Sequence, residues 1–532
     1  MVAAAHPLAA SAGVDMLRNG GNAIDAAVAA GFAASVVMPE MCGLGGDLFA
    51  ILHLPGQTQA PLAVLGAGAS PLGCTLDQMI AAGRPTSTGE VKMPYRGALS
   101  IGVPGMVHAL VEMHQRFGRL SLHQVMAPAI GLADRGFPLT RLGAWSIAVS
   151  EPLLRRHSEA AAVFLKDGTV PGMGTILRQS DLARTLTRIA ERGVAGFYVG
   201  PVADHINRAV GAAGGALRCE DLHLHRTDFE PTIETTYRGW RIHQTGLPSQ
   251  GMILLEALNI AECEPASHLA EINAHAVHMS AELLKLAYAD RLAYACDPKF
   301  APTPLDSLLS KTWARRRYEA IDRLRASETA MAGALADGDT TYLCAADGEG
   351  GMVSLIQSVS SAFGSGLVAG GTGVLLNNRV GRGFSLIEGD PNIFAPGKKT
   401  MNTLNCYMVT NAGGEPVAVG GTPGGDGQPQ WNLQVLTALI DGGLDVQAAV
   451  EAPRWSIWPG TDPADRPNPF ELRIETRVEP STLDHLADLG HRVKASGDWN
   501  GGGGAQLIVR HPGTRVLAGG SDPRVEGFAL GL

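Results

Sequence analysis

Two adjacent threonines, Thr340 and Thr341, stand where a small acidic segment ends and an apolar run begins. Threonine favours strands, so one interpretation is that both residues simply open a strand. The other is that Thr340 becomes a new N-terminus when the Asp339–Thr340 bond breaks. Its hydroxyl would attack carbonyl carbons and its own α-amine would accept the proton, because an α-amine with a pKa of about 7.7–8.0 is partly neutral near pH 7. The second interpretation predicts self-cleavage between Asp339 and Thr340.

A glycine-rich segment, residues 420–427, is the candidate for stabilising negative charge. It reads Gly-Gly-Thr-Pro-Gly-Gly-Asp-Gly between a predicted strand and a predicted helix, so adjacent backbone N–H groups can point at one spot. A phosphate loop requires Lys and then Ser or Thr after its last glycine, whereas Asp426 and Gly427 follow here. The spacing also fails the GxGxxG pattern of dinucleotide loops. An oxyanion-binding loop and a plain turn remain as interpretations.

The elements that must position these residues form a consistent scaffold. Residues 340–346 read as a strand, 347–351 as a turn and 352–359 as a returning strand, which is a β-hairpin pattern. Residues 327–339 lack an apolar face, which is typical of an exposed connector. Other segments read as helices over 8–17, 105–117, 180–192, 270–294 and 430–441, and as strands over 48–54, 372–376 and 416–420.

Composition and charge narrow the class of protein. The 532 residues are 45% hydrophobic and 17% charged with 67 glycines, which fits a soluble α/β protein and does not fit disorder. A net charge of −9 argues against a nucleic-acid partner. The seven cysteines are odd in number and form no CxxC, so we expect neither a disulfide framework nor a zinc ribbon.

Targeting signals are not evident in the sequence. Residues 1–7 lack the basic and apolar regions of a secretory signal. The apolar run over 26–37 is too short to span a bilayer and indicates a packed Ala-rich helix. We therefore expect a cytoplasmic protein with no membrane partner, while Met1 need not be the native start.

Metal and serine-hydrolase signals are weak. His275, His278 and Glu282 could share one helical face, yet no HExxH motif occurs, so we expect neither a catalytic metal nor a cofactor. His223 and His225 are expected at the surface. No GxSxG motif is present.

Many short segments match one known family in the order in which they occur. They lie at residues 6–9, 20–28, 43–46, 103–105, 287–291, 340–341, 375–378, 423–425, 452–454 and 521–524. On these segments the chain resembles the gamma-glutamyltransferase family of N-terminal nucleophile hydrolases over essentially its whole length.

The resemblance implies a layered α/β fold, a four-layer αββα sandwich, and a proenzyme that cuts itself. The large subunit would be residues 1–339 and the small subunit residues 340–532, together one structural unit. Thr340 matches the family nucleophile, and Ser358 matches a second hydroxyl residue that hydrogen-bonds it. Gly424 and Gly425 match the oxyanion pair.

The predicted acyl pocket departs from the glutamyl-specific members. Their Arg that holds the substrate α-carboxylate is absent, with Leu76 near that place. Five further contact residues are replaced: Ser360 stands for an Asn, Arg379 and Arg382 for the pair that receives the α-ammonium, and Asn402 and Thr403 for paired serines. An ammonium facing two guanidiniums is electrostatically unfavourable. We therefore expect γ-glutamyl compounds not to be the preferred substrates.

A guanidinium suits a carboxylate that has no neighbouring ammonium. Arg379 therefore predicts an anionic acyl group that is not an α-amino acid, such as an oxamate-like or dicarboxylic half-amide. Residues 93–97 and 103–105 resemble the family branch that includes oxamate amidohydrolase, which makes Arg96 a second candidate anion contact. Two structural interpretations stay open: Arg96 bonding backbone carbonyls, and Arg379 pairing with an acid such as Glu388.

The primary hypothesis is an amidohydrolase that forms an acyl-Thr340 ester, which water resolves. One alternative is a true γ-glutamyl hydrolase or transferase acting on glutathione-like substrates. Another is an uncleaved, inactive homologue that serves as a binding protein, although the intact Thr340, Ser358 and glycine pair argue against it. Expected partners are a small-molecule amide and the two subunits of one precursor, with a homo-oligomer of such heterodimers left open.

Overall fold

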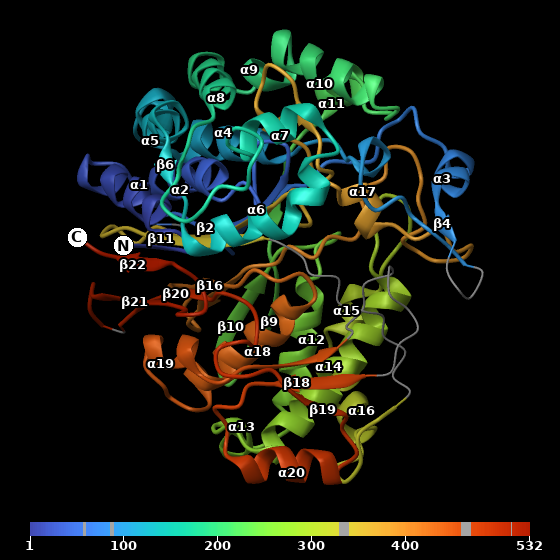
Figure 1. Ribbon diagram of the computed structural model, residues 1–532. Coiled ribbons are helices and arrows are strands. Elements are labelled where there is room, and N and C mark those ends of the chain that lie inside the picture. Colours follow the sequence, from blue (N-terminus) through green and yellow to red (C-terminus); the bar gives the residue numbers. More distant parts are fainter. Residues whose placement is uncertain (57–59, 86–89, 329–339, 459–469, 512) are drawn as a thin grey trace.

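The computed structural model describes residues 1–56, 60–85, 90–328, 340–458, 470–511 and 513–532. Two β-sheets lie face to face, and helices cover the outer face of each (Figure 1). In spatial order the seven-stranded sheet comprises β22 (Phe528–Leu530), β1 (Val2–Ala4), β11 (Thr341–Ala346), β12 (Met352–Ser358), β2 (Asp47–His53), β3 (Leu62–Gly66) and β8 (Asp228–Pro231). The six-stranded sheet comprises β21 (Leu517–Ser521), β20 (Gln506–Arg510), β16 (Pro416–Gly421), β15 (Tyr407–Thr410), β10 (Trp240–Gln244) and β9 (Ile233–Tyr237).

Helices form the two outer layers. Over the seven-stranded sheet lie α1 (Pro7–Arg18), α2 (Ala23–Val37), α4 (Met106–Phe117), α5 (Leu122–Arg135), α6 (Arg141–Leu154), α7 (Ser158–Phe164), α8 (Ser180–Arg192), α9 (Ala195–Tyr198), α10 (Pro201–Ala212) and α11 (Cys219–Leu224). On the other side lie α12 (Gly251–Ala261), α13 (Ala266–Leu269), α14 (Ala274–Tyr294), α15 (Leu305–Leu308), α16 (Lys311–Glu319), α18 (Gly427–Ile440), α19 (Val446–Glu451) and α20 (Pro480–Asp488). The predicted αββα sandwich is confirmed.

Shorter elements complete the chain. They are α3 (Leu76–Ala82), a 3-10 turn (Ala98–Ser100) and α17 (Arg379–Gly383), with small sheets formed by β4 (Arg84–Pro85) and β5 (Val91–Lys92), β6 (Phe137–Pro138) and β7 (Ile176–Leu177), β13 (Val368–Ala369) and β14 (Val374–Leu375), and β17 (Trp455–Trp458), β18 (Glu471–Ile474) and β19 (Val493–Ala495).

Alternation along the strands separates an inner from an outer face of each sheet. On β11, Tyr342 and Cys344 belong to the core between the two sheets, whereas Leu343 and Ala345 belong to the core under the first helical layer. Side chains two residues apart on a strand share a face, so Thr340 lies on the inner face with Tyr342. The site must therefore form in the space between the sheets.

The Ala-rich run becomes α2, a helix buried on all sides. It packs against β11 and β12, because alanine side chains let helix and sheet approach closely. Asn22 and Asp25 form a capping box, in which each side chain accepts a hydrogen bond from the backbone N–H of the other. The helix expected over 8–17 and the Gly-Gly break before Asn22 are likewise confirmed.

Most other predicted elements are confirmed with small shifts of their bounds. The hairpin of β11 and β12 has the expected turn, and α8 has the expected ends. The helix predicted from residue 270 begins at Ala274, because the Asn273 side chain accepts a hydrogen bond from Ala276 N and caps it. The strand predicted over 372–376 is only β14. Of the predicted connector, residues 329–339 lie outside the described residues, and this range includes Asp339, the predicted cleavage position.

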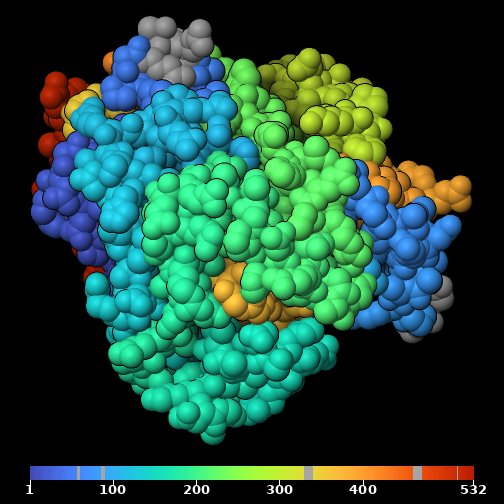
Figure 2. All heavy atoms as spheres, turned by 90° about the horizontal axis from the view of Figure 1, so that it is seen from above, coloured from blue at the N-terminus to red at the C-terminus, as the bar shows by residue number. Residues whose placement is uncertain are grey.

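Segments that follow residue 340 penetrate the first helical layer. Seen from above, atoms of an orange segment are surrounded by blue-green and green parts of the chain (Figure 2). The loop between β13 and β14 makes such contacts: His205 Nδ1 is 2.7 Å from the Gly370 carbonyl oxygen, and Thr185 Oγ1 donates to the Thr372 carbonyl oxygen at 2.8 Å. The two parts of the chain are thus interleaved in the sheet and in the helical layer above it.

The search for membrane spans found none: no helix in the described ranges is both long and apolar enough to cross a bilayer.

Candidate active site

Three polar residues form a row across the middle of the seven-stranded sheet. The register pairs Thr341 with Gln357 and Ser358 with Asp47, so the next position places Thr340 opposite Ser358. Thr340, Ser358 and Asp47 are all buried and lie on neighbouring strands at the same level. A threonine, a serine and a carboxylate thus face the space between the sheets.

The Thr340 hydroxyl has no hydrogen-bond partner among the described residues, although its oxygen is buried. Leaving a buried polar group unpaired costs about 1–3 kcal/mol, so such a group calls for an explanation, and a catalytic role is one. Ser358 Oγ accepts a hydrogen bond from Ser360 N at 2.7 Å, which leaves the Ser358 proton to be donated elsewhere. Ser360 has a φ of +86°, a conformation uncommon for non-glycine residues.

Glycines allow the turn before β2 to approach this row. A Cβ at Gly46 would lie 2.3 Å from the Ser358 carbonyl oxygen, and one at Gly45 would lie 2.2 Å from the Leu375 carbonyl oxygen. Any side chain here would push Asp47 away from Ser358. This accounts for the Gly-Leu-Gly-Gly segment in physical terms.

The two adjacent asparagines after β14 brace the surrounding loops. Asn377 Nδ2 donates to the Gly45 carbonyl oxygen at 2.7 Å. Asn378 Oδ1 accepts from Ser361 N at 3.0 Å, and its Nδ2 donates to the Tyr95 carbonyl oxygen at 3.0 Å. The pair fixes the start of α17 against both the β2 turn and the loop after Ser358.

The glycine-rich loop lies over the beginning of β11. Ser354 Oγ donates to the Gly420 carbonyl oxygen at 3.3 Å, and a Cβ at Gly421 would lie 2.5 Å from the Tyr342 ring. Thus β16 runs along β11 in the direction of Thr340, and the loop continues beyond it. Gly424 and Gly425 have φ of +120° and +54°. Within the described part of the chain, neither N–H has an acceptor.

The Trp431 indole packs directly against the glycines of this loop. A Cβ at Gly424 would lie 2.1 Å from the Trp431 ring, one at Gly427 2.4 Å, and one at Gly502 2.5 Å. Only glycine fits at these three positions. Trp431 therefore fixes the distance between the loop and the start of α18.

A buried ion pair holds the loop from the other side. Arg291 on α14 donates from Nη1 to Asp426 Oδ1 at 2.8 Å and to Gln250 Oε1 at 2.6 Å. Gln250 Nε2 donates in turn to the Gly425 carbonyl oxygen at 2.9 Å, and Tyr288 donates to the Asp426 carbonyl oxygen. Both charged side chains are about 1% exposed. Residues before the predicted cut thus orient the glycine pair after it.

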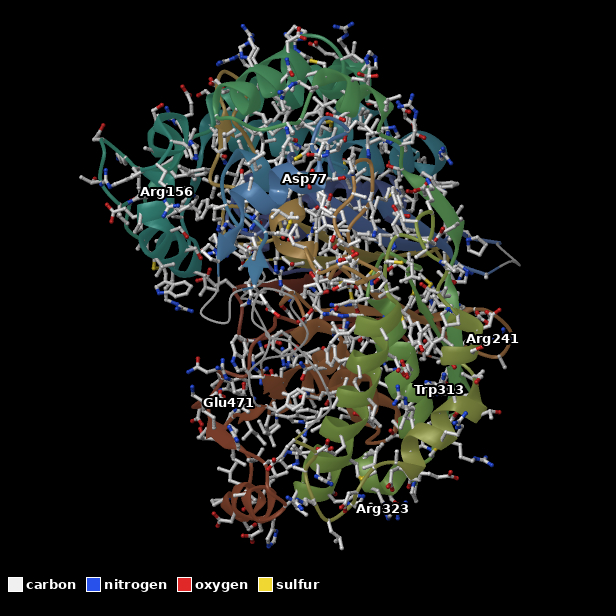
Figure 3. The ribbon with its side chains drawn as sticks, turned by 90° about the vertical axis from the view of Figure 1, so that its right-hand side faces the viewer. Asp77, Arg156, Arg241, Trp313, Arg323 and Glu471 are labelled. Atoms are coloured by element: carbon white, nitrogen blue, oxygen red, sulfur yellow. The ribbon has the colours of Figure 1, made fainter. Side chains whose placement is uncertain are left out.

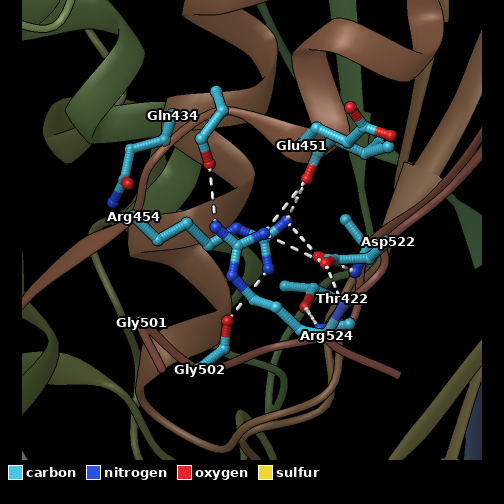
Figure 4. Close-up of polar contacts among 12 residues, drawn as sticks. Thr422, Gln434, Glu451, Arg454, Gly501, Gly502, Asp522 and Arg524 are labelled. Atoms are coloured by element: carbon cyan, nitrogen blue, oxygen red, sulfur yellow. Dashed lines mark hydrogen bonds and ion pairs between the residues drawn. The ribbon is translucent and has the colours of Figure 1, made fainter. Parts of the chain in front are cut away.

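A second ionic cluster, formed by Arg454, Asp522 and Arg524, also supports the glycine-rich loop (Figure 4). Asp522 lies between Arg454 and Arg524, with N–O distances of 2.5 Å and 3.0 Å. Arg454 also donates to the Gly502 carbonyl oxygen at 2.9 Å, and Gly502 packs on Trp431. The segments at 452–454 and 521–524 are therefore part of the support for the glycine loop.

Arg379 contacts Asp47 and not Glu388, which is exposed. Its Nε donates to Asp47 Oδ2 at 2.8 Å, with both side chains buried. Burial raises the pKa of the Asp47 carboxyl, and the Arg379 guanidinium opposes that shift. Asn402 Nδ2 lies 3.4 Å from the same carboxylate oxygen. The expected pocket residues Arg379 and Asn402 thus converge on the Thr340 row through an acid that the sequence analysis missed.

The remaining predicted pocket residues divide into two groups. Arg382 Nη1 donates to the Ser360 carbonyl oxygen at 2.9 Å, beside the row. The hydroxyl oxygens of Ser360 and Thr403 are buried and lack a hydrogen-bond partner among the described residues. Arg96, in contrast, donates to the carbonyl oxygens of Ala362 and Gly364, the arrangement that its structural interpretation predicts.

The surface prediction is confirmed for His223, which is exposed, and is wrong for His225. His225 is buried, stacked on Tyr198 and edge-on to His108, and burial holds its pKa well below the ordinary value. His278 and Glu282 lie together with His491, whereas His275 faces a different group. Spacing along a helix could not reveal this division, because the partners come from distant segments.

The gamma-glutamyltranspeptidase family model matches residues 9–532. The chain belongs to the gamma-glutamyltranspeptidase family. It is accordingly an enzyme of the N-terminal nucleophile hydrolase type, and the expected family is confirmed.

Individual relatives cover nearly the whole chain. The glutathione hydrolase-like YwrD proenzyme of Bacillus subtilis is 36% identical over 100% of this chain and 98% of its own. The oxamate amidohydrolase proenzyme of Klebsiella pneumoniae is 33% identical with the same coverage. The crystal structure of cephalosporin acylase from Bacillus halodurans superposes with a TM-score of 0.90 at 34% identity, covering 99% of this chain and 94% of that one. Relatives described as proenzymes imply cleavage of one precursor into a large and a small subunit.

Proposed function

We propose that this protein cleaves itself between Asp339 and Thr340 and then hydrolyses amides through an acyl-Thr340 ester. The position of Thr340 carries the proposal: it directly precedes the interior strand β11, its buried hydroxyl is unpaired among the described residues, and it stands opposite Ser358. In the uncut chain the hydroxyl oxygen adds to the carbonyl carbon of residue 339. The C–N bond breaks as an ester forms on the Thr340 oxygen, which frees the Thr340 α-amine. Water then hydrolyses the ester to give the carboxylate of Asp339 and restore the Thr340 hydroxyl.

The mature enzyme repeats the same chemistry on its substrate. The Thr340 α-amine accepts the hydroxyl proton, and the oxygen attacks the amide carbonyl. The proton passes to the departing amine, and water hydrolyses the acyl ester. Ser358 fits the role of the hydroxyl that orients Thr340, since its own oxygen is already held by Ser360 N.

The N–H groups of Gly424 and Gly425 fit the role of oxyanion donors. Donors that are fixed before the reaction stabilise the developing charge without reorganisation, and removing one typically costs about 10²–10³ in kcat. Trp431 and the Arg291–Asp426 pair supply that rigidity.

For the substrate, we favour an acyl group that carries a carboxylate and no α-amino group. Two guanidiniums on α17, those of Arg379 and Arg382, contact the row and the loop after it. A substrate ammonium beside them is unfavourable, whereas a carboxylate accepts forked hydrogen bonds from such groups. The similarity to an oxamate amidohydrolase over the full length supports the same substrate class.

A second candidate is hydrolysis of γ-glutamyl amides. Asp47 provides a carboxylate at the site that would accept an α-ammonium if its bond to Arg379 opened. Glutathione hydrolase proenzymes of Pseudomonas sp. and Escherichia coli are 33% and 32% identical to this chain.

Two measurements test the proposal in turn. The intact mass of the purified protein, with N-terminal sequencing, should give two fragments, one beginning Thr-Thr-Tyr. A single chain after long incubation would instead support the binding-protein alternative. The kcat/KM values for oxamate, for dicarboxylic half-amides and for γ-glutamyl-p-nitroanilide should then favour the first two classes. A clear preference for the glutamyl compound would refute the substrate assignment and leave the cleavage chemistry intact.

A further inference from the structure

Two histidines and a glutamate converge where α12, α13 and α14 meet, at the end of the molecule remote from β11 (Figure 1). His268 Nδ1 lies 2.9 Å from Glu264 Oε2, and His275 Nε2 lies 3.7 Å from the same oxygen. The three ligand atoms are all within 4.8 Å of one another. This Glu264–His268–His275 cluster has no part in the proposed chemistry at Thr340.

The Glu264 carboxylate is buried. Its side chain is 3% exposed, and its Oε1 accepts a hydrogen bond from the Tyr318 hydroxyl at 2.8 Å. One oxygen is therefore held by the protein, while the other faces the two imidazoles.

Both imidazoles face Glu264 Oε2, and not all of their ring nitrogens are hydrogen-bonded. The rings lie 5.2 Å apart, edge to face. His275 Nε2 is shielded from solvent and has no hydrogen-bond partner in the described part of the chain. His268 and His275 are otherwise about half exposed, so a cation and its water ligand can reach the cluster from solution.

We propose that the Glu264–His268–His275 cluster binds one divalent transition-metal ion, Zn²⁺ above all. In tetrahedral zinc sites the metal–ligand bonds are about 2.0–2.2 Å, so ligand atoms lie about 3.4 Å apart. The distances to Glu264 Oε2, 2.9 Å and 3.7 Å, bracket this value. Zn²⁺ takes the place of the proton between His268 Nδ1 and the carboxylate, and that proton passes to solvent. A water molecule takes the fourth coordination position.

Charged neighbours of the cluster are compatible with a cation. Arg238 donates to the Glu264 carbonyl oxygen at 2.6 Å, but its charge is offset by Asp441 at 2.9 Å. Arg323, which Figure 3 places at the lower end of the molecule, donates to the Tyr318 hydroxyl at 2.6 Å. That contact fixes the hydroxyl that holds Glu264, as the outer partners of metal ligands commonly do.

The neighbouring group of His278, Glu282 and His491 is the weaker metal site. Lys285 Nζ already lies 2.7 Å from Glu282, so the carboxylate has a cation partner. His278 Nδ1 and His491 Nε2 are bonded to each other at 2.9 Å, and all three residues are buried. A metal would have to displace both interactions in a closed core. The cluster around Glu264 requires only small side-chain rotations.

The consequence is a structural link among three helices. Glu264 follows α12, His268 is on α13, and His275 is in the first turn of α14. A metal bound in the folded state alone stabilises that state by mass action. The ion would therefore hold α14, the helix that carries Arg291, against its neighbours.

The test uses the full-length protein, free of any histidine tag and dialysed against a chelator. Titration calorimetry with Zn²⁺ should show one ion bound per 532-residue molecule, cut or uncut, and the thermal midpoint should rise with Zn²⁺. His268→Ala and His275→Ala should each weaken binding at least tenfold. His123→Ala, at another exposed histidine, is the matched control and should not. Co²⁺ in place of Zn²⁺ should give the visible absorption of a four-coordinate site, which the double variant lacks.

Three outcomes would overturn the inference: no heat of binding with Zn²⁺, unchanged binding in the double variant, or loss of binding in a His491 variant alone. Circular dichroism confirms that the variants fold. Thr340→Ala should bind Zn²⁺ as the wild type does, so failure of the catalytic proposal and failure of this one are distinguishable.

Discussion

The catalytic row and the acyl pocket lie side by side but are built in different ways. Thr340 and the glycine loop are placed by β11, β12 and β16, and two buried ionic clusters support the loop. The pocket depends on side chains from a short helix, α17, that meet an acid on β2. Sheet geometry therefore determines where the chemistry occurs, while individual charge pairs determine what is bound. Mutations in the catalytic row should therefore abolish activity, whereas mutations in the acyl pocket should lower it in smaller steps.

The largest effect is expected at Thr340. Thr340→Ala should leave one uncut chain with no amidase activity, because both attacks use the same hydroxyl. Thr340→Ser should cut more slowly and keep part of the activity. Electrophoresis, intact mass and amide turnover measure both steps, with Thr341→Ser as the neighbouring control. An alanine variant that matured and turned over substrate would exclude Thr340 as the nucleophile.

The support of the glycine loop should rank second. Asp426→Asn leaves the buried Arg291 charge without its carboxylate, and breaking such a pair costs about 3–5 kcal/mol. We expect a lower thermal midpoint and a kcat that falls on the order of 10²-fold, as when one oxyanion donor is lost. Glu112→Gln breaks a partly exposed pair with Arg116 and should cost less than about 1 kcal/mol. If Asp426→Asn does not fold, Arg291→Lys provides the same comparison, and an unchanged kcat there would contradict the positioning role.

The acyl pocket should change by smaller steps. The double variant Asp47→Asn/Arg379→Gln removes both charges and avoids a lone buried ion. It should still mature, but kcat/KM for a carboxylate-bearing amide should fall about 10- to 100-fold, the value of a charge-assisted hydrogen bond of roughly 1.5–3 kcal/mol. Asp47→Asn alone removes the carboxylate that Arg379 Nε contacts and should lower KM for the same substrate.

Arg96→Lys is the control for that series. Since Arg96 donates to backbone carbonyl oxygens, its variant should alter stability and leave KM unchanged. A KM that rises with Arg96→Lys but not with the double variant would move the anion site from α17 to Arg96.

The smallest expected effect concerns the scaffold and not the site. Burial lowers the pKa of His6 and of His243 to about 4, so both are neutral in the folded protein. The unfolded chain takes up protons near its ordinary pKa of about 6.5, so stability is present above that pH and is lost as pH falls toward 4. Between pH 6.5 and 5.5 each of these two histidines should lower the free energy of unfolding by about 1 kcal/mol.

Denaturant unfolding of the uncut Thr340→Ala chain measures this loss on a single polypeptide. His243→Asn should reduce the pH dependence, whereas His123→Asn, at an exposed position, should not. An identical slope in the first variant would mean that His243 has the same pKa in the folded and the unfolded chain.

The difference between the two regions also determines what could be predicted from the sequence. The hairpin after Thr340 and the glycine loop are local patterns, so their residues could be named from the order of amino acids alone. The Asp47–Arg379 pair joins residues 332 positions apart, and neither residue's surroundings indicate the other. The apolar strand that follows Asp47 was visible, but an acid at the start of a strand does not by itself point to a pocket. The same limit applies to Arg291 and Asp426, and to His225, whose burial depends on the distant rings of Tyr198 and His108.

Strands from before and after residue 340 pair with each other within one sheet: β1 lies between β22 and β11, and β12 pairs with β2. Cleavage at Thr340 would leave every one of these pairings in place, yet it would change the molecularity of unfolding. The uncut chain folds in a first-order process, whereas the two fragments must find each other in a second-order one. The midpoint of thermal unfolding would then depend on concentration only after maturation. Folding would have to be complete before the bond breaks, and the requirement for a folded site at Thr340 enforces that order.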